Sequence, residues 1–81
     1  MEYSFAGFSR ITVNSEVCMG KPCIRGMRMP VASILGYIAG GMSIDNILAE
    51  FDFLEREDIN QALSFASVLS LDEFIPLKKA S

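Results

Sequence analysis

The segment from Gly20 to Val31 constrains the fold of this chain most, because it concentrates two glycines and two prolines within eleven residues. A proline fixes its own φ and drives the preceding residue towards extended geometry, so Pro22 and Pro30 favour an extended backbone. Glycine adopts backbone angles that a side chain excludes, which allows turns at Gly20 and Gly26. This stretch, called here the Gly-Pro segment, is therefore predicted to connect a strand to a helix.

Residues 10–29 are predicted to form a short β ribbon. Arg10 to Val13 are rich in β-branched side chains of alternating character, which is typical of a strand. An isolated two-stranded ribbon is rarely stable, so this one either lies on the helices or continues into a sheet with a second copy of the chain. Residues 1–9 show no clear period and are predicted to form an N-terminal arm. Phe5 and Phe8 of this arm pack either on the domain or on a partner.

Three amphipathic helices are predicted after the ribbon, over about residues 30–39, 44–51 and 56–69. Each has apolar residues at the spacing of one helical face. Gly40 and Gly41 end the first helix, and Ser43 suits the start of the second. The short connections favour a mostly α fold, a three-helix bundle of the helix-turn-helix or homeodomain type with a short N-terminal β ribbon. Residues 10–70 then form one domain.

The chain is unusually hydrophobic for its size, with 51% apolar residues in a length of 81. A domain this small buries only about 60–65% of its unfolded surface, so a monomer would be marginally stable and we expect a homodimer. Beyond Ser70 the helical pattern ends, and residues 71–81 are called here the C-terminal tail. A tail this apolar is expected to fold back on the helices or to dock elsewhere. Its apolar side chains belong to Leu71, Phe74, Ile75 and Leu77.

Several classes of function lack the residues that they need. The chain contains no histidine, the commonest general base and metal ligand. Cys18 and Cys23 supply only two of the four ligands that a zinc site requires, and the phosphate-loop pattern is absent. We therefore expect no enzymatic activity, no metal, no cofactor and no small-molecule ligand. The sequence has no apolar run of transmembrane length and no signal peptide, which indicates a cytoplasmic protein with reduced thiols.

The net charge of −3 is unevenly distributed. Up to Met42 four basic and two acidic residues give +2, and from Ser43 onward three basic and eight acidic residues give −5. The acidic balance argues against strong non-specific nucleic-acid binding. Two local surfaces are still candidates for DNA contact, the start of the third helix and the basic part of the ribbon. Their candidate DNA-binding residues are Arg10, Lys21, Arg25, Arg28, Arg56, Asn60 and Gln61.

The same residues have structural roles as an alternative. Arg25 and Arg28 would then form ion pairs with Glu16, Asp45 or Glu50, or hydrogen-bond the turns of the Gly-Pro segment. The outer face of the third helix would be a solvated surface, with acidic residues placed to stabilise the positive end of the helix dipole.

Several short motifs point to a known family. They are Gly-Lys-Pro-x-Ile-x-Gly-x-Arg at residues 20–28, Met29-Pro30-Val31, Gly41-Met42-Ser43, Ile47-Leu48, and Glu57-Asp58-Ile59 with Ala62-Leu63. With them, the chain resembles the bacterial domain-of-unknown-function family 433 from about Arg10 to Val68. Met27 departs from the small or hydroxylated residue usual in the family. Glu55 stands where the family tends to have Thr or Ser, so we expect a weaker start of the third helix.

The resemblance implies a three-helix, homeodomain-like bundle with an N-terminal β segment. It also implies an antitoxin-like role, in which the chain neutralises a PIN-type ribonuclease encoded beside it. Such a nuclease gathers carboxylates around Mg²⁺, so a lysine that reaches the active site would compete with the metal. The tail is our candidate for this contact, with the partner-binding residues Leu71, Phe74, Ile75, Leu77, Lys78 and Lys79.

Two other functions stay open at this point. The chain could be a helix-turn-helix transcription regulator that binds its own operator DNA, with or without a toxin. A dimer of that kind would place its two reading elements about 34 Å apart, one turn of DNA. The remaining alternative is a structural homodimer with no role at nucleic acids.

Overall fold

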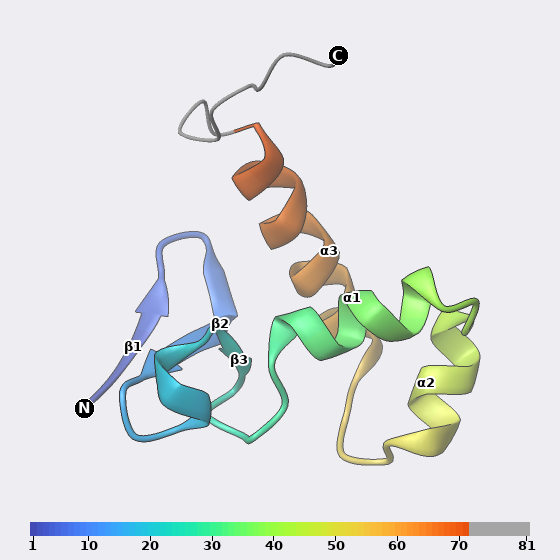
Figure 1. The fold of residues 1–81 in the computed structure, drawn as a ribbon, viewed down its shortest axis with the longest axis horizontal. Helices are drawn as coiled ribbons and strands as arrows, with labels where there is room; N and C mark the ends of the chain where they lie inside the picture. The colour runs from blue at the N-terminus through green and yellow to red at the C-terminus, as the bar shows by residue number, and fades with distance from the viewer. Residues whose placement is uncertain (72–81) are drawn as a thin grey trace, which may run out of the picture.

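A computed structural model of the chain describes residues 1–71, which form a small antiparallel sheet and three helices (Figure 1). The sheet has the strand order β1-β2-β3. Its strands are β1 (Glu2–Phe5), β2 (Phe8–Asn14) and β3 (Cys23–Ile24), and a short 3₁₀ turn, η1 (Cys18–Gly20), precedes β3. The sequence predicted an arm and a two-stranded ribbon here. The structure differs because residues 2–5 pair with β2 as a third strand, with Tyr3 opposite Val13.

The Gly-Pro segment makes a tight turn directly after β3, which folds Met29 and Pro30 back against that strand. Met27 N–H donates to the Ile24 carbonyl oxygen at 2.8 Å, and the two residues between them, Arg25 and Gly26, have φ values of 46° and 70°. Two successive positive φ angles are the geometry of a type I′ hairpin turn. Thr12 fixes this turn from β2, since its Oγ1 accepts the Gly26 N–H at 2.7 Å. The turn therefore points the side chain of Arg25 in one defined direction.

The three predicted helices are confirmed with bounds that differ by one residue. They are α1 (Val31–Ala39), α2 (Ile44–Glu50) and α3 (Arg56–Ser70). Ser43 caps α2 as expected, because its Oγ accepts the Asn46 N–H at 3.0 Å. Pro30 lies just before α1, with an extended ψ of 144°.

The start of α3 differs from the expectation of a weak cap. The carboxylate of Asp58 accepts the Glu55 N–H at 2.8 Å, while the Asp58 N–H donates to the Glu55 carbonyl oxygen at 2.9 Å. The expectation rested on the absence of a Thr or Ser hydroxyl at position 55. The helix instead begins with a capping-box arrangement, in which the side chain of Asp58, the third helical residue, accepts the backbone N–H of the N-cap residue Glu55.

The core is shared by the sheet and all three helices. Ile11, Ile24, Ile34, Ile47 and Ile59 are completely buried in one cluster. Five fully buried side chains from five different elements tie the whole described chain into one packed unit.

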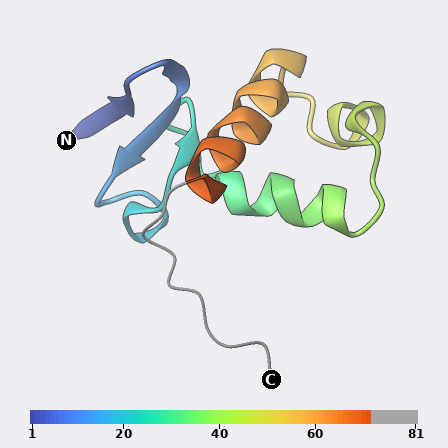
Figure 2. The same ribbon diagram turned by 90° about the horizontal axis from the view of Figure 1, so that it is seen from above.

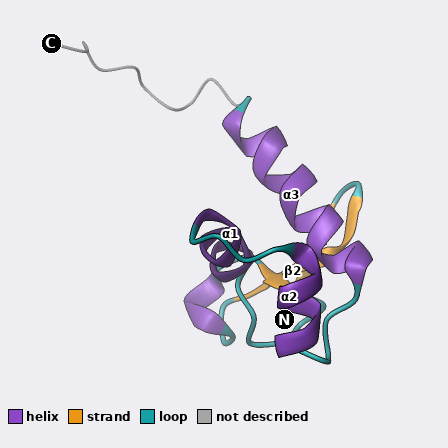
Figure 3. Cartoon of the chain, turned by 90° about the vertical axis from the view of Figure 1, so that its right-hand side faces the viewer, coloured by secondary structure: helices purple, strands orange, loops and turns teal. Residues whose placement is uncertain are grey.

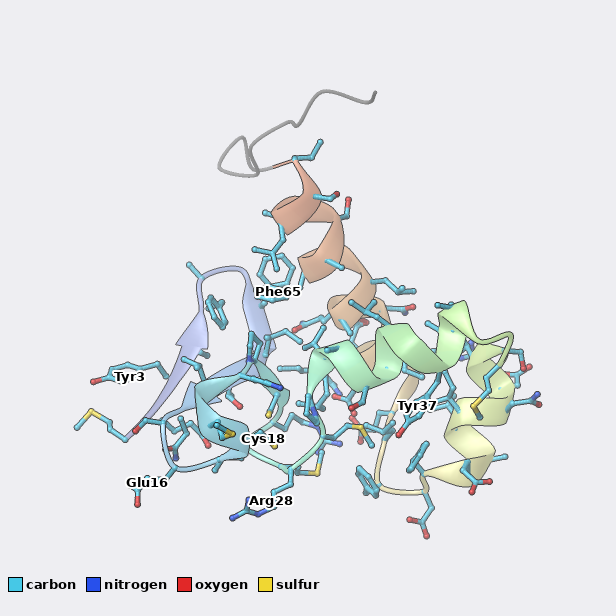
Figure 4. The ribbon with its side chains drawn as sticks, viewed as in Figure 1. Tyr3, Glu16, Cys18, Arg28, Tyr37 and Phe65 are labelled. Atoms are coloured by element: carbon cyan, nitrogen blue, oxygen red, sulfur yellow. The ribbon has the colours of Figure 1, made fainter. Side chains whose placement is uncertain are left out.

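The N-terminal aromatic residues pack on the domain. The rings of Phe5 and Phe8 lie 4.8 Å and 5.4 Å from the ring of Phe65 on α3, which faces the β1–β2 hairpin in Figure 4. This arrangement decides between the two alternatives that the sequence left open for these residues. It also anchors the middle of α3 to the sheet.

The last turns of α3 extend past α1 and the sheet (Figures 1 and 3). Seen from above, α3 crosses beside the start of α1, with the sheet on its other side (Figure 2). The C-terminal half of α3 is therefore flanked by the body along part of its length, and its end is open to solvent.

Candidate binding surface

Asp58 joins α3 to the sheet through a cluster of charges centred on its own buried carboxylate. Its side chain is fully buried and accepts hydrogen bonds from Arg25 Nε and Nη2, both at 2.9 Å, and from Arg10 Nη1 at 3.0 Å. Arg25 also donates to the carbonyl oxygen of Phe53 at 2.8 Å. A bidentate arginine–carboxylate pair is among the stronger polar contacts in proteins. Arg10 and Arg25, two candidate DNA-binding residues, thus lie together and fasten α3 to the ribbon.

The arginines keep Asp58 ionised. Burial alone would raise the pKa of this carboxyl, but the hydrogen bonds from Arg25, from the Glu55 N–H and from Arg10 outweigh it and lower the pKa below its usual value. In return, the hydrogen bond to Asp58 raises the pKa of Arg25. The cluster stays charged across the physiological pH range.

Two further candidates at the start of α3 contact other side chains of the chain. Arg56 forms an exposed ion pair with Asp45 of α2. Gln61 accepts the backbone N–H of Arg10 through Oε1 at 2.9 Å, so it helps to hold β2 against α3. Sequence reasoning considered ion pairs of Arg25 and Arg28 with Glu16, Asp45 or Glu50. Among the described residues Arg25 pairs with Asp58 instead, and the partner of Asp45 is Arg56.

The other three candidates, Lys21, Arg28 and Asn60, are exposed, the first two on the Gly-Pro segment and Asn60 on α3. Arg28 points away from the body below the Gly-Pro segment (Figure 4). Asn60 lies on α3 near Glu57, which is also exposed. The seven candidates do not form one basic surface, because three arginines are paired with carboxylates and the exposed start of α3 carries acidic groups.

The buried stripe of α3 continues beyond the part of the helix that the body covers. Ile59, Ala62 and Phe65 are buried, whereas Leu69, one turn further along the same face, is 49% exposed. Residues three or four apart share a helix face, so Leu69 belongs to the stripe by position but is only partly covered. The helix carries more apolar face than the described chain buries.

This uncovered part of the stripe borders an apolar groove of about 210 Å³. One wall comes from the start of α1 and the prolines that precede it, and the other comes from α3. Lys21 and Ala32 also line the groove, and both are exposed. The apolar walls include Pro22, Pro30, Val31, Leu35, Ala66 and Leu69.

The outer face at the end of α3 is also apolar. Val68 is 54% exposed and Leu71 is 77% exposed. From Ile59 to Leu71 the chain contains no charged residue, so this whole end of α3 is uncharged in a protein of net charge −3. A surface of this kind is typical of contacts with another polypeptide segment.

Of the six predicted partner-binding residues, Leu71 lies at the exposed end of α3. Phe74, Ile75, Leu77, Lys78 and Lys79 lie outside the described residues. Sequence reasoning placed the contact in the tail, with the Phe5 and Phe8 arm as a further candidate, and missed the groove between α1 and α3. The signal was present, because Leu69 completes the apolar stripe of the third helix.

A second hollow, of about 450 Å³, lies on the sheet. Met1, Tyr3 and Val13 line it, and the side chain of Tyr3 points outward from β1 (Figure 4). Its lining combines strand residues with Ser15 and Gly20 of the loop that follows β2.

The described residues contain no cluster of three or more metal-ligating side chains. Cys18 is half-buried and Cys23 is buried, and both are free thiols. Burial, with a side-chain hydrogen bond to Cys18, raises the pKa of Cys23 to about 11, so this thiol is protonated at neutral pH. Within residues 1–71, no helix combines the length and the apolar character that crossing a bilayer requires.

Comparisons with known proteins point to one family, by sequence and by structure. The model of a family described as a protein of unknown function, DUF433, matches residues 11–66. The crystal structure of a DUF433 member protein from Anabaena variabilis ATCC 29413 is similar, with a TM-score of 0.69 and 29% sequence identity. That similarity covers 72% of this chain and 57% of the other, so the present chain spans little more than half the length of that protein. No curated protein matches the chain.

Proposed function

The chain belongs to the DUF433 family of proteins of unknown function, and we propose that it is an interaction protein that binds a partner protein through the groove between α1 and α3. The partner is a PIN-type ribonuclease, which the chain neutralises in an antitoxin-like role. The proposal is carried by one observation, the continuation of the buried stripe of α3 into a groove that the described chain leaves open.

Apolar burial supplies the driving force for this contact. Complete burial of a leucine side chain is worth about 1.5–3 kcal/mol, so covering Leu69 and Leu35 favours association. The uncharged stretch from Ile59 to Leu71 adds no cost of desolvating charges. An apolar face of a partner helix laid between two helices is a common mode of recognition.

Binding of operator DNA receives less support from the same structure. Phosphate contacts need accessible lysines and arginines, but Arg10, Arg25 and Arg56 each have a carboxylate partner. Glu55 and Glu57 are exposed at the start of α3, where a reading helix would approach DNA. We therefore propose protein binding, and not DNA binding, as the main function of the chain.

The tail completes the proposed neutralisation. Leu71 leads from the end of α3 into a segment with further apolar residues and a pair of lysines, Lys78 and Lys79. In the proposed complex the apolar residues cover the nuclease beside the groove. The lysines reach the carboxylates of its active site and compete with the bound Mg²⁺.

Co-expression of the tagged chain with a PIN-type ribonuclease encoded beside its gene tests this function. We expect the two proteins to purify together and the ribonuclease activity to fall. Leu69→Asp places a charge in the groove and should abolish co-purification. The matched control is Ser67→Asp, which adds the same charge two residues away on the exposed side of α3.

Equal co-purification of both variants would show that the groove is not the binding site. An active ribonuclease in the presence of excess wild-type chain would reject the antitoxin-like role altogether. A mobility-shift assay on the upstream DNA at low salt, where phosphate contacts are strongest, measures the alternative function.

A further inference from the structure

We propose that residues 72–77 of the same chain occupy the groove between α1 and α3 when no partner is bound. These residues lie outside the described part of the chain, and the argument starts from the groove that is described. The inference rests on the proposed function in one respect, because the partner would have to displace this segment from the site that it binds.

The groove sets two requirements for its occupant. Its walls are apolar, so the occupant must bring apolar side chains to cover Leu69 and Leu35. Lys21 is the one charged residue in the lining, and it is exposed at the rim. An occupant with a carboxylate beside its apolar residues would therefore complement the groove in both charge and polarity.

The sequence that follows α3 has this composition. Asp72 and Glu73 come directly before Phe74 and Ile75, and Leu77 follows. The acidic pair matches Lys21, and the three apolar residues match the walls. The rest of the tail, from Lys78 onward, carries positive charge and has no such match with the lining.

The position of the tail also fits. Leu69 lines the groove, and the described chain ends two residues later at Leu71. Along the helix, Phe65 lies about 9 Å behind Leu71, at about 1.5 Å per residue. The six residues after Leu71, up to Leu77, span up to about 20 Å when extended, which is enough to reverse direction and follow the groove.

Covalent attachment favours this segment over a second copy of the chain. A short tether gives an effective concentration in the millimolar range, well above the micromolar concentrations at which purified proteins are usually studied. A tail that leaves the groove on partner binding is then available to cover the partner. The same residues would thus cover the groove in the free protein and the partner surface in the complex.

A single tryptophan in the full-length chain tests the proposal, because the natural sequence has none. We expect the emission of Phe74→Trp to be blue-shifted and shielded from acrylamide, at a level independent of protein concentration. Adding Leu69→Asp or, as a second groove variant, Ala32→Glu should shift the emission to the red and restore quenching. Ser67→Asp is the control that should leave the emission unchanged, and circular dichroism confirms that each variant is folded.

A charge exchange tests the acidic pair. Lys21→Glu should reduce the ratio of docked to free tail by a factor of up to about 5, as expected for a surface ion pair, and Asp72→Lys with Glu73→Lys should restore it. The proposal is overturned if the tryptophan is exposed in the otherwise natural chain, or if it stays shielded in both groove variants. Shielding that appears only as a dimer forms would assign the groove to a second copy and would equally overturn it. No ribonuclease is present, so these results are independent of the proposed function.

Discussion

Replacing Asp58 by Asn should destabilise the fold far more than any exposed charge does. The substitution keeps the volume of the side chain but removes the charge that Arg10 and Arg25 share. Breaking a buried ion pair costs about 3–5 kcal/mol when the remaining charge stays buried. Here the arginine side chains are 28% and 36% exposed, so water compensates part of the loss and we expect about 2–3 kcal/mol.

That loss is large relative to the stability of so small a domain. At roughly 0.05–0.15 kcal/mol per residue, the free energy of unfolding is about 4–12 kcal/mol. With a urea m-value of about 1 kcal/mol/M, the midpoint of unfolding followed by circular dichroism should fall by about 2 M or more. The matched control is Asp45→Asn, which removes an ion pair whose two side chains are 82% and 56% exposed and should cost under about 1 kcal/mol.

The pH dependence provides an independent check on the same carboxylate. The pKa of Asp58 is lowered in the folded state, so its contribution is present above the unfolded pKa of about 3.9 and is lost as the pH falls through the folded value. The difference in stability between the natural chain and Asp58→Asn should therefore shrink below about pH 4. A midpoint no lower than that of Asp45→Asn at pH 7 would refute a stabilising role for the cluster.

Three smaller predictions concern the ribbon. Thr12→Val leaves the Gly26 N–H without its acceptor and should lower the free energy of unfolding by about 1–3 kcal/mol, measured by urea titration. Gly26→Ala places an L residue at a positive φ and makes its Cβ clash with a Glu2 carboxylate oxygen; a loss of about 1–2 kcal/mol is expected, and unchanged stability would contradict the turn geometry. Iodoacetamide at pH 8 should alkylate Cys18 before Cys23, whose pKa is raised to about 11 by burial, whereas both thiols should react at similar rates in urea.

Local patterns were sufficient to predict the helices. Each has an apolar stripe with helical spacing, and its ends carry residues whose backbone preferences act over a few positions, such as Ser43 and Gly40. The family resemblance, which rests on the motif from Gly20 to Arg28, is confirmed by the match over residues 11–66. These features depend on residues that are close together in the sequence, so the amino-acid sequence alone determines them.

Strand β1 could not be predicted in the same way. Its four residues alternate polar and aromatic side chains, but so short a run does not distinguish a strand from an irregular arm, and they form a strand because β2 offers a free edge to pair with. Pairing of this kind depends on a partner strand and a hairpin more than on intrinsic preference.

The roles of the charged residues and the groove were decided by the tertiary structure. Arg10, Arg25 and Asp58 are separated by up to 48 positions in the chain, and only the packing of β2, the Gly-Pro segment and α3 brings them within hydrogen-bonding distance. An arginine in a sequence is equally suited to a phosphate or a carboxylate, and the folded chain selects between them by supplying the carboxylate. Likewise the sequence determined that α3 has a long apolar face, but how much of that face the rest of the chain covers is a property of the packed structure alone.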